Sequence, residues 1–417
     1  MSLVRVADRD RSMHSAIHVS RVFVLVAAFL FARSFLSAQS ANRQSATLHL
    51  QKAASGISAG QLDLAEKELQ SVLQTEPEEY RALDLLGVVR VLQHQEAKAE
   101  DLFIEAVQKE PDFAAAHAHL GLLYLKLART DDAVRELRKT LRLDPNRSDA
   151  ADALVHVLEQ QAQAASESGR WDQALALISD ARKYAPENAD IQYEFGLIAL
   201  HLSLDEDAVG AFGQTLKLRP NDALAVYNLG RAFMELSKFD EARLQFAAYI
   251  KIRPSDPSGY CALGMTLAAL QRSSDSREQF GRSIALAPSQ TESYYRLALL
   301  DLGSGDYATA AQNLRHVLDR EPNNAAALTA LGRVNFEQKR YPEAVSLLAQ
   351  AVASDNTLRQ AHYYLGLAFA RLGRKQESSE QLEIGTRLEH EETQRRRTIL
   401  RIVEPSPPDQ PGPPTEK

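Results

Sequence analysis

Apolar and small residues recur along most of the chain in one fixed order, which predicts consecutive pairs of helices. An apolar residue followed by glycine opens the order, as in Leu86-Gly87, and a second small residue, here Ala99, comes twelve positions after that glycine. A large apolar residue, here Phe103, stands four positions further on. The Leu-Gly pair or a variant of it begins at Leu86, Leu120, Phe195, Leu229, Leu263, Leu297, Leu331 and Leu365.

The small residues mark the places where the predicted helices cross. Two helices of about 12 to 14 residues approach closely only where a small side chain lies at the crossing, and the next large residue then fills the adjoining groove. Turn segments such as Ser237-Lys238-Phe239-Asp240 separate the two helices of a pair. Each unit of the pattern therefore indicates a helix, a tight turn and a second helix.

Proline recurs with the same period and ends the second helix of the first eight predicted pairs, while the ninth has Asn356 at that position. The spacing is 34 residues except for one interval of 41, and such a period is typical of a solenoid. The seven extra residues before Pro186 equal about two helical turns. They predict a lengthened first helix near residues 149–167, with Ser148 as its N-cap and a seam beside it. The prolines are Pro77, Pro111, Pro145, Pro186, Pro220, Pro254, Pro288 and Pro322.

The pattern resembles the tetratricopeptide repeat (TPR), whose W-x2-L-G-x2-Y, A-x3-F and P positions it matches. The resemblance implies an all-α fold, a right-handed superhelical solenoid of about ten helix-turn-helix repeats over residues 41–392. A polar segment after Leu382 predicts a C-terminal capping helix that ends within 393–404, and the Pro-rich residues 405–417 predict a disordered tail. The repeats begin near Ala46, Tyr80, Ala114, Val155, Ala189, Ala223, Pro257, Thr291, Ala325 and Arg359.

The first forty residues have the order of a secretory signal peptide. Arginines precede an eleven-residue apolar run that starts at Val22, and small residues follow it. A membrane-spanning helix needs roughly 20 residues, so cleavage is favoured, with Ala41 as the new N-terminus. We therefore predict export to the periplasm or the extracellular space. A membrane tether through residues 22–38 is the alternative, and translation could start at Met1 or at Met13.

Charge and cysteine content narrow the classes of partner. The chain has a formal net charge of −7, of which residues 1–40 carry +3, so the remaining residues carry −10. General nucleic-acid binding rests on many Lys and Arg contacts to phosphate, so this balance argues against a nucleic-acid partner. The single cysteine, Cys261, excludes an intrachain disulfide.

No set of residues in the sequence forms a convincing catalytic or metal site. His117 and His119 are two residues apart and point to different helix faces, so they are interpreted as surface or hydrogen-bonded histidines rather than zinc ligands. Gly303-Ser304-Gly305 lies in a predicted inner turn without a preceding strand, which argues against a phosphate loop. Cys261 is interpreted as a packed thiol. We therefore predict a protein that is not an enzyme and that uses no cofactor and no metal.

TPR proteins hold peptides or partner segments in a groove lined by the first helices, and the resemblance implies the same here. The fifth, sixth and ninth residues of each first helix then face the groove. Tyrosine offers a large area with a polar tip and arginine pairs with carboxylates, so both suit recognition of a protein or peptide. In the alternative, the tyrosines pack between repeats and the arginines pair with Glu194, Glu235 or Glu337. The predicted groove residues are Tyr193, Tyr227, Asn228, Arg231, Tyr295, Arg296, Arg333 and Tyr363.

These observations predict a non-enzymatic, exported scaffold that binds a peptide or protein partner and meets a membrane only through its N-terminal segment. The alternative is a membrane-tethered structural assembly factor of a secretion or envelope complex. Two groove specialisations of the family are not carried over. The carboxylate clamp needs asparagine and basic residues in consecutive repeats, but Ala262 follows Asn228 one repeat later, and the asparagine ladder is missing.

Overall fold

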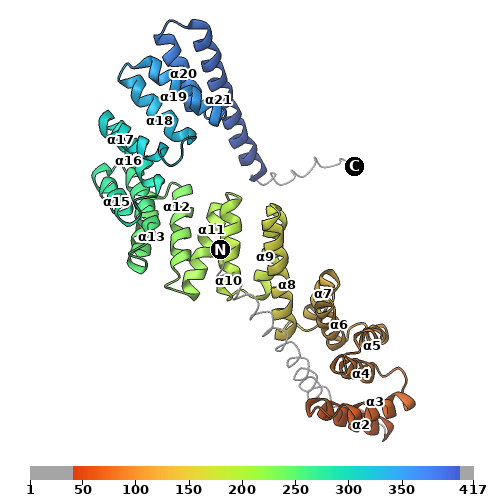
Figure 1. The fold of residues 1–417 in the computed structure, drawn as a ribbon. Coiled ribbons are helices and arrows are strands. Elements are labelled where there is room, and N and C mark those ends of the chain that lie inside the picture. The colour runs from red at the N-terminus through yellow and green to blue at the C-terminus, as the bar shows by residue number, and fades with distance from the viewer. Residues whose placement is uncertain (1–40, 404–417) are drawn as a thin grey trace, which may run out of the picture. The chain divides into compact units, whose positions relative to one another are not determined.

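The computed structural model describes residues 41–403, which form twenty α-helices and no β-strand. Consecutive helices pair off as ten helix-turn-helix repeats (Figure 1). The predicted all-α solenoid of about ten repeats is therefore confirmed. The predicted signal peptide at 1–40 and the Pro-rich tail at 405–417 lie outside the described residues.

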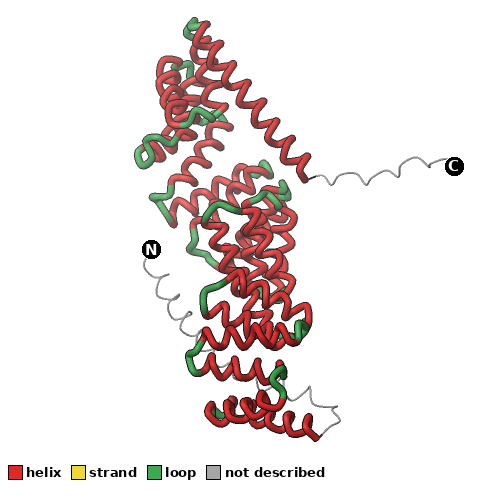
Figure 2. The backbone as a smooth tube through the Cα atoms, turned by 90° about the vertical axis from the view of Figure 1, so that its right-hand side faces the viewer, coloured by secondary structure: helices red, strands yellow, loops and turns green. Residues whose placement is uncertain are grey.

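Short turns join the two helices of each repeat (Figure 2). The first helices are α2 (Ala41–Ser58), α4 (Tyr80–Leu92), α6 (Ala114–Lys126), α8 (Ser148–Glu167), α10 (Ala189–His201), α12 (Ala223–Glu235), α14 (Pro257–Ala269), α16 (Thr291–Gly303), α18 (Ala325–Glu337) and α20 (Arg359–Arg371). The second helices are α3 (Leu62–Thr75), α5 (Glu96–Lys109), α7 (Thr130–Leu143), α9 (Trp171–Tyr184), α11 (Asp205–Leu218), α13 (Phe239–Ile252), α15 (Ser273–Leu286), α17 (Tyr307–Leu318), α19 (Tyr341–Ser354) and α21 (Lys375–Val403).

Three helices are clearly longer than the rest, namely α2 with 18 residues, α8 with 20 and α21 with 29. The first helix α8 has 20 residues, whereas α6 and α10 have 13, which accommodates the seven extra residues of that repeat. The prediction of Ser148 as its N-cap is wrong. Arg147 occupies that position with an extended backbone, and its Nε donates a hydrogen bond of 3.1 Å to Oδ1 of Asp149 in the first turn. The second helix α21 runs on without a break for 29 residues, so the predicted capping helix continues the last repeat.

Glycine and a large apolar residue meet where the two helices of a repeat cross. A methyl group placed on Gly87 would lie 2.5 Å from the ring of Phe103, and one on Gly196 would lie 2.6 Å from Phe212. The same contact recurs at Gly230–Phe246 and Gly264–Phe280, while leucine takes the place of phenylalanine at Gly121–Leu137, Gly332–Leu348 and Gly366–Leu382. The crossings inferred from the small residues are therefore confirmed.

The turn inside each repeat has a left-handed backbone at the second residue after the first helix. Glycine takes this conformation at Gly60, Gly169, Gly305 and Gly373, where it costs little. Other residue types take it in the remaining six repeats, at His94, Ala128, Ser203, Ser237, Gln271 and Lys339. In this conformation the N–H of the next residue can donate a hydrogen bond to a carbonyl of the first helix. For example, Gln95 N donates to Arg90 O at 2.9 Å.

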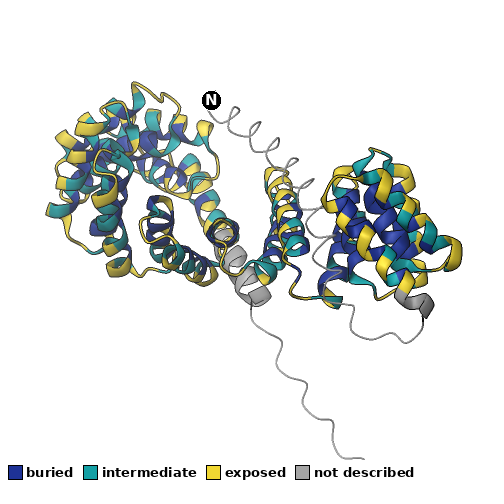
Figure 3. Cartoon of the chain, turned by 90° about the horizontal axis from the view of Figure 1, so that it is seen from below, coloured by how far each residue is buried: buried dark blue, intermediate teal, exposed yellow. Residues whose placement is uncertain are grey.

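The described helices form two compact units that divide between Pro220 and Asn221, so α2–α11 belong to the first unit and α12–α21 to the second. The core of each unit lies between its helices, and exposed residues lie on the outside (Figure 3). The largest fully buried side chains are the ring residues Phe103 and Phe212 in the first unit and Phe246 and Phe280 in the second. The seam expected near 149–167 stays a prediction.

Within residues 41–403, no helix combines the length and the apolar character that a membrane span requires.

Candidate functional site

Seven of the eight predicted groove residues lie in the second unit, and Tyr193 lies in the first. All of them are on first helices. In the second unit, α14, α16, α18 and α20 pack side by side in chain order, and α12 joins this series through α13, so we treat corresponding positions of these first helices as one face. We call this face the first-helix face. Its predicted residues are Tyr227, Asn228 and Arg231 on α12, Tyr295 and Arg296 on α16, Arg333 on α18 and Tyr363 on α20.

Asn228 and Arg231 on α12 interact with each other. Nη1 of Arg231 donates a hydrogen bond of 3.0 Å to Oδ1 of Asn228, which lies one helical turn earlier. Asn228 is buried and Arg231 is exposed, so the amide orients the guanidinium from beneath. The helix begins at Ala223 because Asp222 caps it, with Oδ1 accepting a hydrogen bond of 3.0 Å from Ala225 N.

Tyr227 packs within its own repeat. Its ring centroid lies 5.5 Å from that of Phe246 and 5.0 Å from that of Tyr249, both on the second helix α13. Burial raises the pKa of the Tyr227 hydroxyl. This ring is therefore partly a packing residue, and only its remaining surface is open to a partner.

On α16, an aromatic and a cationic side chain are neighbours. Nε of Arg296 donates a hydrogen bond of 2.6 Å to Oε1 of Glu292, one turn earlier on the helix. The same guanidinium lies 5.7 Å from the centre of the Tyr295 ring. Tyr295 is half-buried, and burial raises its pKa.

The next two first helices bring a second arginine to an aromatic pair. The Arg333 guanidinium lies 5.4 Å from the ring centre of Tyr364, across the boundary between α18 and α20. Tyr364 in turn lies edge-on to Tyr363, with ring centroids 5.3 Å apart. Tyr363 is 47% exposed, which is high for a large apolar residue in this chain. The ion pair of Arg333 with Glu337 is long, at 4.0 Å.

The side chains of the first-helix face are of types that suit carboxylates and apolar groups. Arg296 and Arg333 are each more than a third exposed, and their pairs with Glu292 and Glu337 are one-turn pairs on the helix surface. Such pairs contribute only about 0–1 kcal/mol to stability, so a partner carboxylate can replace them at little cost. The tyrosine rings supply area for the apolar groups.

In the first unit, Tyr193 packs with its ring 5.7 Å from Phe212, and the neighbouring Glu194 is half-buried. Oε2 of Glu194 is buried and accepts no hydrogen bond from the residues that the structure describes. Burial, with the charges of Glu159 and Asp190 nearby, raises the pKa of Glu194 to about 7. The Glu194 side chain therefore favours its protonated form near neutral pH.

This shift predicts a pH dependence of stability. The pKa of Glu194 is higher in the folded than in the unfolded state, so its protonated form favours folding. This contribution to the free energy of unfolding is fully present below pH 4.5 and is lost as the pH rises through about 7. Replacing Glu194 with glutamine should remove this loss. The free energy of unfolding of the wild type should therefore fall between pH 5 and pH 8 by about 1–2 kcal/mol more than that of Glu194→Gln, a figure reduced to allow for the partial exposure of the side chain. Urea denaturation of both proteins at the two pH values measures this difference. Glu187→Gln, at an exposed site, is the control, and equal pH profiles for wild type and Glu194→Gln would contradict the assignment.

The first unit contains a buried polar pair that was not predicted from the sequence. Nδ1 of His119 and Oδ1 of Asp84 lie 2.7 Å apart, and both side chains are 1% exposed. His117, on the same helix, contacts Oε2 of Glu136 at 2.8 Å and the carbonyl oxygen of Pro111 at 3.0 Å. The expectation that these histidines are hydrogen-bonded is met. Asp84 follows the apolar Leu83 without any local signal, and only its spacing of 35 residues from His119, about one repeat, could have revealed it.

The described residues contain no group of three or more His, Cys, Asp or Glu side chains that could hold a metal ion. Cys261 is buried, and burial raises the pKa of its thiol, so the protonated and weakly nucleophilic form is favoured.

The fold thus defines a helical-repeat protein of the solenoid class, in which stacked helix pairs present their first helices along one face. Models of the tetratricopeptide repeat match residues 90–156 and 301–390, and a second set matches 159–215 and 206–257, together more than half of the chain. The chain belongs to the tetratricopeptide repeat family.

A stretch of 89 residues is 33% identical to a protein of Petunia hybrida described as a probable UDP-N-acetylglucosamine–peptide N-acetylglucosaminyltransferase SPINDLY. This stretch is 21% of the chain and 10% of the plant protein, so the chain spans about a tenth of that relative. Among solved structures, MamA from Desulfovibrio magneticus RS-1 is 21% identical with a TM-score of 0.39 and covers 41% of this chain and 96% of its own. YrrB, described as a TPR protein with an unusual peptide-binding site, is 20% identical with a TM-score of 0.36 and covers 46% and 95%.

Proposed function

We propose that the protein is a non-enzymatic scaffold that binds a peptide or protein partner on the first-helix face of its second unit. The observation that carries the proposal is the row of arginines and tyrosines on neighbouring first helices. Arg296 lies beside Tyr295, Arg333 lies beside Tyr364, and Tyr363 stands almost half exposed next to them. Tyrosine and arginine are the residue types that concentrate binding energy at protein interfaces.

The proposed roles differ along this face. Arg231, Arg296 and Arg333 would pair with carboxylates of the partner. Tyr295 and Tyr363 would supply contact area with a hydroxyl at the edge. Asn228 is a positioning residue, because it is buried and holds Arg231 through the hydrogen bond of 3.0 Å.

A pull-down from an envelope extract tests this proposal. We expect the variant Arg296→Gln with Arg333→Gln to recover about tenfold less partner than the wild type, because each loses a charge-assisted hydrogen bond. The control is Arg272→Gln with Arg282→Gln, because Arg272 precedes the second helix α15, Arg282 lies within it, and both are more exposed than Arg296 and Arg333. Equal recovery by the two double variants would reject the assignment of this face.

We also propose that the protein is exported, with residues 1–40 removed as a signal peptide. The support is the order of arginines, apolar run and small residues in the sequence. N-terminal sequencing of the purified protein tests it, and a chain that starts at Ala41 is the expected result. A chain that retains residues 22–38 would reject cleavage and favour the membrane-tethered assembly factor.

A further inference from the structure

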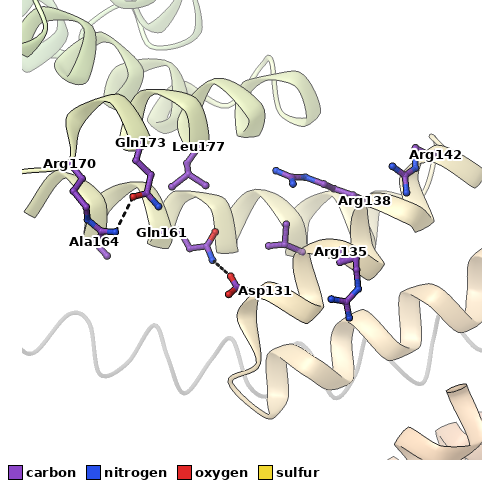
Figure 4. A pocket seen from close by; sticks show the side chains of 10 residues that line it. Asp131, Arg135, Arg138, Arg142, Gln161, Ala164, Arg170, Gln173 and Leu177 are labelled. Carbon is purple, nitrogen blue, oxygen red and sulfur yellow. Dashed lines mark hydrogen bonds between the residues drawn. The ribbon is translucent and has the colours of Figure 1, made fainter. Parts of the chain in front are cut away.

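A hollow of about 650 Å³ lies in the first unit, between the second helices α7 and α9 and the lengthened first helix α8 (Figure 4). Four arginines line it, three of them from α7: Arg135, Arg138 and Arg142. The fourth, Arg170, precedes α9 and lies at the opposite end of the hollow from Arg142, with Gln161 and Leu177 between them. The hollow is thus elongated, with a cation at each end.

The four guanidiniums differ in how far carboxylates already neutralise them. Arg138 donates a hydrogen bond of 2.5 Å to Asp180, and Arg135 pairs with Asp132 and Glu136 at 2.8 and 3.1 Å. Arg170 reaches only an amide, Oε1 of Gln173 at 2.9 Å.

Arg142 has no hydrogen bond or ion pair among the residues that the structure describes, and it is exposed. The two ends of the hollow therefore hold the cations that lack a carboxylate.

The spacing and the lining indicate the shape of an occupant. Arg135, Arg138 and Arg142 recur at intervals of three and four residues, so they form one stripe that rises about 10 Å along α7. An extended peptide repeats its side chains on one face about every 7 Å, so a segment that runs along the hollow can place carboxylates near both Arg142 and Arg170. Val134 and Leu177 add apolar surface for the side chains between them.

We propose that this hollow is a second binding site and that it takes an extended peptide segment with acidic residues at alternate positions. Carboxylates of the segment pair with Arg142 and Arg170 at the two ends, where the planar guanidinium offers two parallel donors. Asp131, Asp132, Glu136 and Asp180 lie between or beside these two arginines, so a segment whose negative charges fall at the two ends is favoured over a phosphate backbone, which is charged at every nucleotide. This site lies in the first unit and is independent of the first-helix face.

Fluorescence anisotropy with the full chain tests the proposal. The probe is a labelled peptide of about nine residues in which Glu alternates with Leu, and the control peptide carries Gln in place of Glu. We expect the acidic peptide to bind, the Gln peptide to bind about tenfold more weakly or not at all, and added salt to weaken binding. The variant Arg142→Gln with Arg170→Gln should weaken binding of the acidic peptide about tenfold.

The variant Arg272→Gln with Arg282→Gln is the control, because these exposed arginines lie in the second unit. Circular dichroism should show the same helix content for all forms, since Arg142 makes no contact that its loss would break. The proposal is overturned if the Gln peptide binds as tightly as the Glu peptide, if a single-stranded DNA oligonucleotide binds more tightly than either, or if both double variants bind like the wild type.

Discussion

Replacing Phe246 with alanine should lower the free energy of unfolding by about 3–5 kcal/mol, because it empties a fully packed helix crossing. The ring is 1% exposed and lies against Gly230, where a methyl group would come within 2.8 Å of it. Gly230→Ala is expected to cost about 1–3 kcal/mol for the opposite reason, since the added methyl group overpacks the crossing. Urea denaturation followed by circular dichroism measures both.

A double variant separates this contact from general helix effects. One repeat of the second unit already pairs Ala298 with Leu314, both buried, in place of glycine with phenylalanine. Gly230→Ala with Phe246→Leu should therefore lose less stability than the two single changes added together. Gly281→Ala is the control, because nothing lies within 4 Å of its added methyl group, and it should gain up to about 1 kcal/mol. A gain of the same size from Gly230→Ala would show that the crossing does not need glycine.

The second large effect is expected at the buried pair of Asp84 and His119. His119→Leu should destabilise the first unit by about 3 kcal/mol or more, because it leaves a carboxyl group buried without its hydrogen-bond partner at 2.7 Å. Replacing both residues with leucine should cost less than either single change, since neither member of the pair is then left buried without the other. Thermal or urea denaturation of the three variants decides this. A double variant less stable than both single variants would contradict the account.

Most of the fold was predictable because it rests on local intervals. Eight first helices begin at the residue expected from the repeat, from Tyr80 to Arg359, since the small residues, with a proline in most repeats, fix the phase. The left-handed turns at residues such as Lys339 were not predictable, because the geometry of two packed helices overrides the preference of the side chain. The division after Pro220 was also missed, because the repeat keeps its period there.

The sequence predicted where the candidate site residues lie on their helices, but not how far each side chain is buried or what it packs against. The repeat places Tyr227 and Tyr363 at the same position of their first helices, yet one packs on Tyr249 and the other is 47% exposed. That difference depends on the second helix beside each ring. The arginine-lined hollow was missed because Arg142 and Arg170 belong to different helices, and each reads in the sequence as an ordinary surface charge.

Site-specific photocrosslinking tests the central claim, that the first-helix face of the second unit binds a partner. A benzophenone amino acid would replace Tyr363 in one form of the protein and Leu244 in another, because Leu244 is similarly exposed, at 56%, but lies on the second helix α13. Irradiation in cells that make the protein should give a discrete adduct with a partner from position 363 and none from 244. The adduct should fade when Arg333→Gln is added. Equal adducts from both positions, or none from position 363, would contradict the claim.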